Sequence, residues 1–168
     1  MQLQVAGIID DSIVDGDGCR LTVFVQGCAR RCHGCQNRET QPMEGGHRMD
    51  TEDILARLAA NPLLAGITFS GGEPFLQPAP LAELARAVHA RGLDVWSYSG
   101  YTLEELCTRA QKDKATAALL AEVDVLVDGP YEESQRDLTL HFRGSRNQRV
   151  IDMKATRRTH TIQLLYND

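Results

Sequence analysis

The sequence lacks any long apolar run and any pattern typical of a secretory leader. No stretch approaches the roughly 20 apolar residues needed to cross a bilayer. The first residues, Met1 to Val5, do not place an apolar region behind a basic one. We therefore expect a cytoplasmic protein that does not associate with membranes.

Cysteine is present in an odd number, five, which does not fit a framework of disulfides. Three of the five, Cys28, Cys32 and Cys35, fall within a span of eight residues. Crowding of thiols in one short segment of a cytoplasmic protein indicates a metal site.

An excess of positive charge is also missing. The net charge of −5 weighs against a general nucleic-acid binder. The segment 136–158 differs, because it holds seven basic and two acidic residues, a local charge of +5 that leaves −10 for the rest of the chain. Such a segment either faces a specific acidic partner or is a solvated surface.

Alternating strand and helix patterns predict an α/β fold. Strands are expected at 21–25, 66–69, 93–97 and 123–127, with helices after Asp50 and near 81–88, 103–110 and 115–122. Residues 38–48 are expected to form a loop. Four or five such units are too few for a closed eight-stranded barrel, so we expect an open or partial (β/α) barrel with a mostly parallel sheet. We expect one domain over residues 1–168.

Polar and ligand-like groups follow several of the predicted strands. Cys28 follows the first of them, and Ser70-Gly71-Gly72-Glu73 follows the second. Ser97 and Asp128 end later strands. Sites in this class of fold gather at the carboxyl ends of the strands, so these residues are expected to converge.

The cysteine spacing, C-x₃-C-x₂-C, suits a [4Fe–4S] cluster. Three thiolates can each bind one iron and leave the fourth iron open to a ligand. Two alternatives remain: a structural zinc site that includes His33, and a closed cluster in which Cys19 is the fourth ligand. Cys107 lies on the apolar face of a predicted helix and is expected to be a small core residue.

Five stretches of the chain resemble the radical S-adenosylmethionine superfamily, and more closely the activating proteins of anaerobic ribonucleoside-triphosphate reductases. They are Val14 to Arg20, Gly27 to Asn37, Thr68 to Pro74, Val127 to Tyr131 and Phe142 to Arg149. The family usually has an aliphatic residue where Cys19 stands, which favours Cys19 as an apolar packing residue.

The resemblance implies a reaction. A [4Fe–4S] cluster on Cys28, Cys32 and Cys35 would reduce S-adenosylmethionine, giving methionine and a 5′-deoxyadenosyl radical. That radical would remove a hydrogen atom from a glycine of the partner reductase. A low-potential electron donor such as flavodoxin is implied as a second partner.

The candidate ligand-binding residues each have a physical reason. Gly71 and Gly72 allow close approach of the backbone to the ligand. The Glu73 carboxylate can accept charge-assisted hydrogen bonds from the ammonium group of S-adenosylmethionine. Ser97 and Asp128 could line the same pocket, although Asp before Gly-Pro is also typical of a turn. The sequence assigns no further catalytic residue.

Two groups of basic residues have open roles. Arg30 and Arg31 either offset the negative charge of the cluster or are solvated loop residues. The segment 136–158 either docks the partner reductase or packs locally, with Arg143 and Gln148 tying the C-terminal strand to the sheet. Two other functions remain open: a small radical enzyme acting on a small molecule, similar to a 7-deazapurine synthase, or on another glycyl-radical protein, and a structural zinc module.

Overall fold

The computed structural model describes residues 1–30 and 32–168. Their strands are β1 (Gln2–Ser12), β2 (Arg20–Val25), β3 (His47–Asp50), β4 (Gly66–Gly71), β5 (Asp94–Tyr98), β6 (Val125–Asp128), β7 (Arg149–Asp152) and β8 (Leu164–Tyr166). Their α-helices are α1 (Thr51–Ala59), α2 (Pro78–Ala90), α3 (Leu103–Ala110), α4 (Lys114–Glu122) and α5 (Met153–Thr159).

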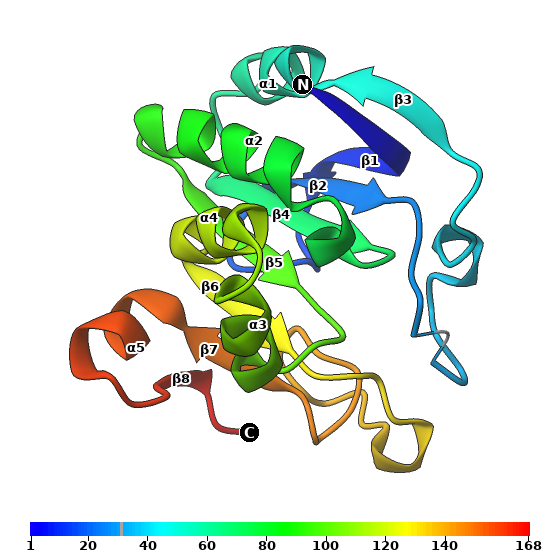
Figure 1. Cartoon of the computed structure of the whole chain (residues 1–168), viewed down its shortest axis with the longest axis vertical. Helices are drawn as coiled ribbons and strands as arrows, with labels where there is room; N and C mark the ends of the chain where they lie inside the picture. The colour runs from blue at the N-terminus through cyan, green and yellow to red at the C-terminus, as the bar shows by residue number, and fades with distance from the viewer. Residues whose placement is uncertain (31) are drawn as a thin grey trace.

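The strands form one sheet in the order β3-β1-β2-β4-β5-β6-β7-β8 (Figure 1). Its centre, β2-β4-β5-β6, is parallel, and the strands on both sides of this centre pair antiparallel. The two outer strands, β3 and β8, are not paired with each other, so the sheet is open. The predicted α/β fold, a partial barrel with a mostly parallel sheet, is confirmed.

Local sequence signals explain most of the helices. The Asp50 side chain caps α1 by accepting a hydrogen bond from the Glu52 amide. Thr102 and Glu105 form a capping box at the start of α3. Pro78 stands at the first position of α2, where its missing N–H costs nothing. These predicted helices are confirmed, with ends that differ by a few residues.

The prediction of a loop over residues 38–48 is wrong at its end. His47 and Arg48 belong to β3, whose residues pair antiparallel with Gln2–Val5 of β1. The paired residues are 42 to 48 positions apart in the chain, so local composition carries no signal for the pairing.

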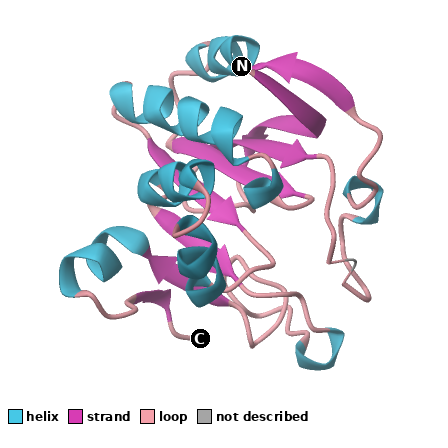
Figure 2. Ribbon diagram, in the orientation of Figure 1, coloured by secondary structure: helices cyan, strands magenta, loops and turns pink. Residues whose placement is uncertain are grey.

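The two faces of the sheet are covered differently. Helices α1 to α4 lie over one face and bury its aliphatic side chains (Figure 2). On the other face, Trp96 and Tyr98 of β5 meet the segment before β7. The Phe142 ring packs edge-on against Trp96 at 5.3 Å, and the Tyr98 hydroxyl donates to the Phe142 carbonyl at 2.6 Å. No helix in the described part of the chain is both long and apolar enough to cross a membrane.

Candidate functional site

The carboxyl ends of the parallel strands lie in register at one edge of the sheet. Val25 at the end of β2 pairs with Gly71 at the end of β4, and Tyr98 at the end of β5 pairs with Val127 of β6. The loops that leave β2 and β6 extend from this edge (Figure 1). The cysteines and the Gly-Gly-Glu turn are therefore neighbours, as the strand pattern predicts.

The cysteine loop is tied at both ends by backbone hydrogen bonds. The amides of Gly27 and Cys28 donate to the carbonyls of Thr40 and Gln41, at 2.7 and 2.9 Å. Inside the loop, the Cys35 amide donates to the Cys32 carbonyl at 3.1 Å. All three cysteines are partly exposed. The loop therefore presents three thiols from one closed turn of chain.

Gln26 organises the segment that returns from the loop, and the sequence patterns did not single it out. Its buried side chain donates to the carbonyls of Pro42 at 2.8 Å and Glu39 at 3.2 Å. One amide group thus holds the far side of the loop against the end of β2. A polar residue between a strand and a glycine was the only available sign.

The other two cysteines lie away from the loop. Cys19 immediately precedes β2, and Cys28 follows it after Gln26 and Gly27, so the six extended residues of β2, about 20 Å, lie between them. Cys19 packs partly against the hydrophobic core. Geometry thus excludes Cys19 as a fourth ligand of a cluster held by Cys28. Cys107 is exposed, so its prediction as a core residue is wrong: α3 buries Leu103 and Leu106 instead.

Gly71 and Gly72 are required by close backbone contacts. A Cβ on Gly72 would lie 2.2 Å from the Gly27 carbonyl oxygen, and one on Gly71 would lie 2.6 Å from the Val25 nitrogen. Gly71 also has φ of +93°, a conformation that glycine adopts without strain. The turn therefore lies directly against the residue that precedes Cys28.

Glu73 is buried at this junction, with 2% of its surface exposed. Its carboxylate accepts hydrogen bonds from the Phe75 amide at 3.0 Å, the Gly100 amide at 2.8 Å and the Ser99 hydroxyl at 2.9 Å. Burial raises the pKa of Glu73, and the hydrogen bonds and Arg30 oppose that rise. Ser99 and Gly100 were missed by sequence reasoning, although Ser-Gly also stands at the end of β4.

Ser97 and Asp128 are both buried. The Ser97 hydroxyl donates to the Tyr98 carbonyl at 3.1 Å, and its register partner on β4 is the core residue Phe69. Asp128 accepts from Arg149 Nε at 3.0 Å and from the Leu103 amide at 2.8 Å. Asp128 thus joins β6, β7 and the start of α3. Their contact with a ligand stays a prediction.

The chain after β6 reaches the cysteine loop. A Cβ on Gly34 would lie 3.3 Å from the Tyr131 ring and 3.1 Å from the Glu133 carboxylate carbon. His33 Nε2 lies 2.9 Å from Glu133 Oε2. The Tyr131 ring also lies 3.1 Å from the Cβ position of Gly144. Tyr131 and Glu133, in the chain after β6, therefore border the cysteine loop.

The early Asp-Gly stretch serves the opposite end of the sheet. Arg20 is fully buried and donates to Thr68 Oγ1 at 2.7 Å, to Asp94 Oδ1 at 2.6 Å and to the Asp17 carbonyl at 3.0 Å. The guanidinium thus joins β4, β5 and the loop before β2. Arg20 therefore anchors the loop before β2 and lies at the opposite end of β2 from the cysteine loop.

Comparison with known proteins agrees with this geometry. Residues 14–151 match the family model of the 4Fe-4S single cluster domain. An anaerobic ribonucleoside-triphosphate reductase-activating protein of Vibrio cholerae is 39% identical over 145 residues, covering 81% of this chain and 89% of the relative. The protein of that name from Escherichia coli K12 is 33% identical over 151 residues, covering 84% and 94%. The chain belongs to the anaerobic ribonucleoside-triphosphate reductase-activating protein family.

A structural likeness extends beyond this activating-protein family. The crystal structure of QueE from Escherichia coli superposes with a TM-score of 0.50 and 17% identity, covering 61% of this chain and 54% of that one. At this identity the likeness concerns the fold alone. The family model for one 4Fe-4S cluster confirms the predicted cluster cofactor.

The residues present fit such a cluster. Three partly exposed thiols lie on one loop, and thiolates are the ligands that iron–sulfur clusters use. The loop borders a glycine turn too tight for any Cβ. Arg31, one of the two predicted charge-balancing arginines, lies outside the described residues. Arg30 lies on the loop and is considered below.

The basic segment divides into bound and exposed residues. Arg143 donates to the terminal residue Asp168, to Oδ1 at 3.0 Å and to the carbonyl oxygen at 2.6 Å. Gln148 accepts from the Gly144 amide and donates to the Gly129 carbonyl, both at 3.0 Å. These two residues pack locally. Arg146, in contrast, is exposed.

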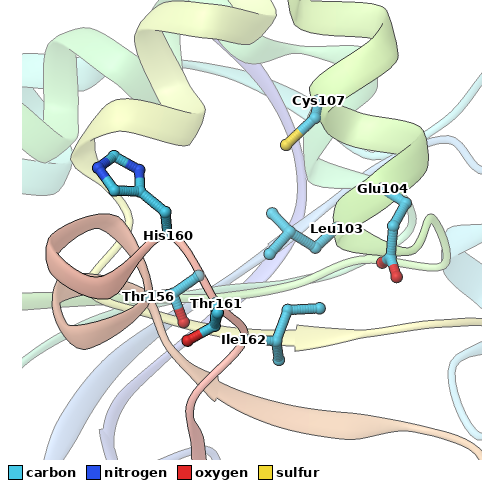
Figure 3. Close-up of a pocket in the computed structure, with 7 residues that line it drawn as sticks. All are labelled: Leu103, Glu104, Cys107, Thr156, His160, Thr161 and Ile162. Carbon is cyan, nitrogen blue, oxygen red and sulfur yellow. The ribbon is translucent and has the colours of Figure 1, made fainter.

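A separate hollow of about 460 Å³ lies between α3 and the chain around the end of α5 (Figure 3). The side chains that line it are Leu103, Glu104, Cys107, Thr156, His160, Thr161 and Ile162. Cys107 faces it from α3. Burial raises the pKa of the Cys107 thiol, and the nearby Glu104 charge raises it further. A raised pKa makes a thiol less reactive at neutral pH.

Proposed function

We propose that this chain is the activating enzyme of an anaerobic ribonucleoside-triphosphate reductase. In this proposal it cleaves S-adenosylmethionine reductively and generates a glycyl radical on the reductase. The observation that carries the proposal is the direct junction between the cysteine loop and the Gly-Gly-Glu turn, in a chain 39% identical to an activating protein of that name.

Cys28, Cys32 and Cys35 would hold the cluster, each through one thiolate. When bound, the [4Fe–4S] cluster supplies the electron that breaks the S–C5′ bond of S-adenosylmethionine, giving methionine and a 5′-deoxyadenosyl radical. The chain contributes position and shielding from water. Gln26 and the Thr40 carbonyl keep the loop closed, so the three thiols stay at the end of β2.

The bonding of Glu73 supports its role as an acceptor for the ammonium group of S-adenosylmethionine. A carboxylate has about four acceptor sites. The Glu73 carboxylate accepts hydrogen bonds from three donors here, the Phe75 and Gly100 amides and the Ser99 hydroxyl. One site is left for a ligand donor. These three donors also hold the carboxylate in one orientation, so less side-chain entropy is lost when a ligand binds.

The remaining predicted residues would act at the rim of the pocket. Gly71 and Gly72 would let the backbone approach the ligand. We retain Ser97 and Asp128 as pocket residues, and Asp128 would act by fixing β6, β7 and α3 together. We also propose a low-potential donor such as flavodoxin and a location in the cytoplasm, where thiols stay reduced.

Anaerobic reconstitution with iron and sulfide tests this function. We expect about four irons per chain and production of 5′-deoxyadenosine from S-adenosylmethionine when a reductant is added. The Cys35→Ala variant is the matched control and should produce none. Stoichiometric zinc without cleavage of S-adenosylmethionine would show a structural zinc module instead.

A further inference from the structure

Arg30 lies between the first two cysteines of the loop and reaches across to the chain between β5 and α3. Its Nη2 donates to Glu105 Oε2 at 3.0 Å, and its guanidinium carbon lies 4.8 Å from the centre of the Tyr101 ring. Only 26% of its side chain is exposed. Arg30 therefore makes specific contacts with the chain that follows β5, which a solvated loop residue would not do.

Glu105 and Tyr101, the two residues that contact Arg30, are each held by a further contact. Glu105 Oε1 accepts from the amide and the hydroxyl of Thr102, both at 3.2 Å, as part of the capping box of α3. Glu105 Oε2 thereby stays turned toward Arg30. Arg109 also contacts Tyr101, with its guanidinium carbon 4.5 Å from the centre of the same ring. Stacking on an aromatic ring orients a planar guanidinium.

Gly100 places the arginine beside the buried Glu73. A Cβ on Gly100 would lie 2.6 Å from Arg30 Cδ and 3.5 Å from Glu73 Oε1. The Gly100 amide also donates to that same oxygen at 2.8 Å. The arginine stem and the carboxylate thus meet on one glycine. Among the described residues, the Arg30 Nε atom is buried and has no hydrogen-bond partner.

We infer that Arg30 is a positioning residue, which bridges the cysteine loop to the β5–α3 turn and so fixes the cluster ligands relative to Glu73. This inference rests on the proposed function, because it concerns the S-adenosylmethionine site of that reaction. The Glu73 amide donates to the Gly27 carbonyl at 2.8 Å, which ties the start of the loop to the end of β4. Arg30 ties the loop to the turn between β5 and α3. Arg30 is therefore the contact that fixes the middle of the loop relative to the turn that carries Gly100 and faces Glu73.

The test compares reconstituted holoenzyme variants in binding of S-adenosylmethionine. Arg30→Gln should weaken binding about tenfold, with normal iron content and a smaller change of the EPR spectrum when the ligand is added. Glu105→Gln keeps the capping box but removes the charge that holds Arg30, and should weaken binding about threefold. The double variant should bind no more weakly than Arg30→Gln, because both changes break one contact.

Arg38→Gln is the matched control, since Arg38 is an exposed arginine three residues after Cys35. It should bind as the wild type does. If Arg30→Gln loses iron, Glu105→Gln decides the question alone. Unchanged binding in Glu105→Gln, additive effects in the double variant, or equal weakening in Arg38→Gln would overturn the inference. Failure of the wild-type holoenzyme to cleave S-adenosylmethionine would instead overturn the proposed function.

Discussion

The backbone amide of Glu73 donates a hydrogen bond of 2.8 Å to the carbonyl of Gly27, the residue that precedes the first cysteine of the loop. One residue earlier, the Gly72 amide donates to the Val25 carbonyl at 2.8 Å. The Gly-Gly-Glu turn therefore continues the pairing of β2 with β4 beyond the ends of both strands. The loop that would hold the cluster and the turn that would bind its ligand form one structural unit.

Gly72→Ala should disturb both halves of this unit. The new Cβ would lie 2.2 Å from the Gly27 carbonyl oxygen, and the backbone must move to accommodate it. We expect a loss of about 3 kcal/mol in the free energy of unfolding, together with lower iron content and weaker binding of S-adenosylmethionine. Denaturant unfolding and iron analysis measure these effects.

Gly7→Ala is the control for this substitution. A Cβ on Gly7 would have no atom within 4 Å, and this glycine has no positive φ. It should leave stability and iron content unchanged. Wild-type behaviour of Gly72→Ala would contradict the unit described above.

The cysteines should separate into two classes when replaced by alanine. Cys28→Ala, Cys32→Ala and Cys35→Ala should each prevent a stable [4Fe–4S] cluster. Cys19→Ala should retain it, because Cys19 and Cys28 lie at opposite ends of β2. Iron, sulfide and EPR analysis of reconstituted protein measures this. Loss of the cubane in a folded Cys19→Ala protein would refute the assignment of an open fourth iron.

Much of the fold and of the site could be predicted from local patterns. Capping residues and apolar periodicity located α1, α2 and α3, and the cysteine spacing located the loop. The antiparallel strands β1, β3, β7 and β8 were not predicted, because their pairing depends on partners remote in the sequence. Within the site, Gln26 and Ser99 were missed for a similar reason: each acts through contacts that only the folded chain brings together.

Cys107 shows the limit of a helical pattern. It falls on the apolar repeat of α3, yet it faces the hollow beside α5 rather than the core. The apolar repeat identifies which side of α3 is apolar, but it does not show how much of that side a neighbouring helix covers. The short helix α5 leaves part of that side uncovered.

His89 should make stability depend on pH. Its ring nitrogens each lie 2.7 Å from a carboxylate oxygen, of Glu122 and of Asp124, and Lys154 lies 3.6 Å from Asp124. Burial lowers the pKa of His89, but these hydrogen bonds outweigh it and the pKa is raised above 6.5. The stabilisation is therefore complete below pH 6.5 and is lost as the pH rises through the folded pKa.

Denaturant unfolding of wild type and His89→Gln at about pH 6 and about pH 8 measures this effect. The difference between the two proteins should be larger at the lower pH, by less than about 1 kcal/mol because the ring is partly solvated. An equal difference at both pH values would exclude the histidine as its source.

Arg146 should matter for docking of the reductase, whereas Arg143 should matter for folding. Arg146 is exposed, and only 4% of the Arg143 side chain is. Arg146→Glu should slow radical formation on the reductase several-fold, more so at low salt, with normal cleavage of S-adenosylmethionine in its absence. Arg143→Glu should lower the melting temperature. If Arg146→Glu lowers stability and cleavage as well, the segment around it is structural.

The proposed activity is the generation of a glycyl radical on a partner reductase, and this product can be observed directly. The reconstituted protein, S-adenosylmethionine and a low-potential reductant are mixed with the anaerobic ribonucleoside-triphosphate reductase of the same organism, and the mixture is examined by EPR spectroscopy. We predict a glycyl radical on the reductase, with 5′-deoxyadenosine and methionine formed in equal amounts, and no radical with Cys35→Ala. Formation of 5′-deoxyadenosine without any glycyl radical on the reductase would show that this chain does not activate it.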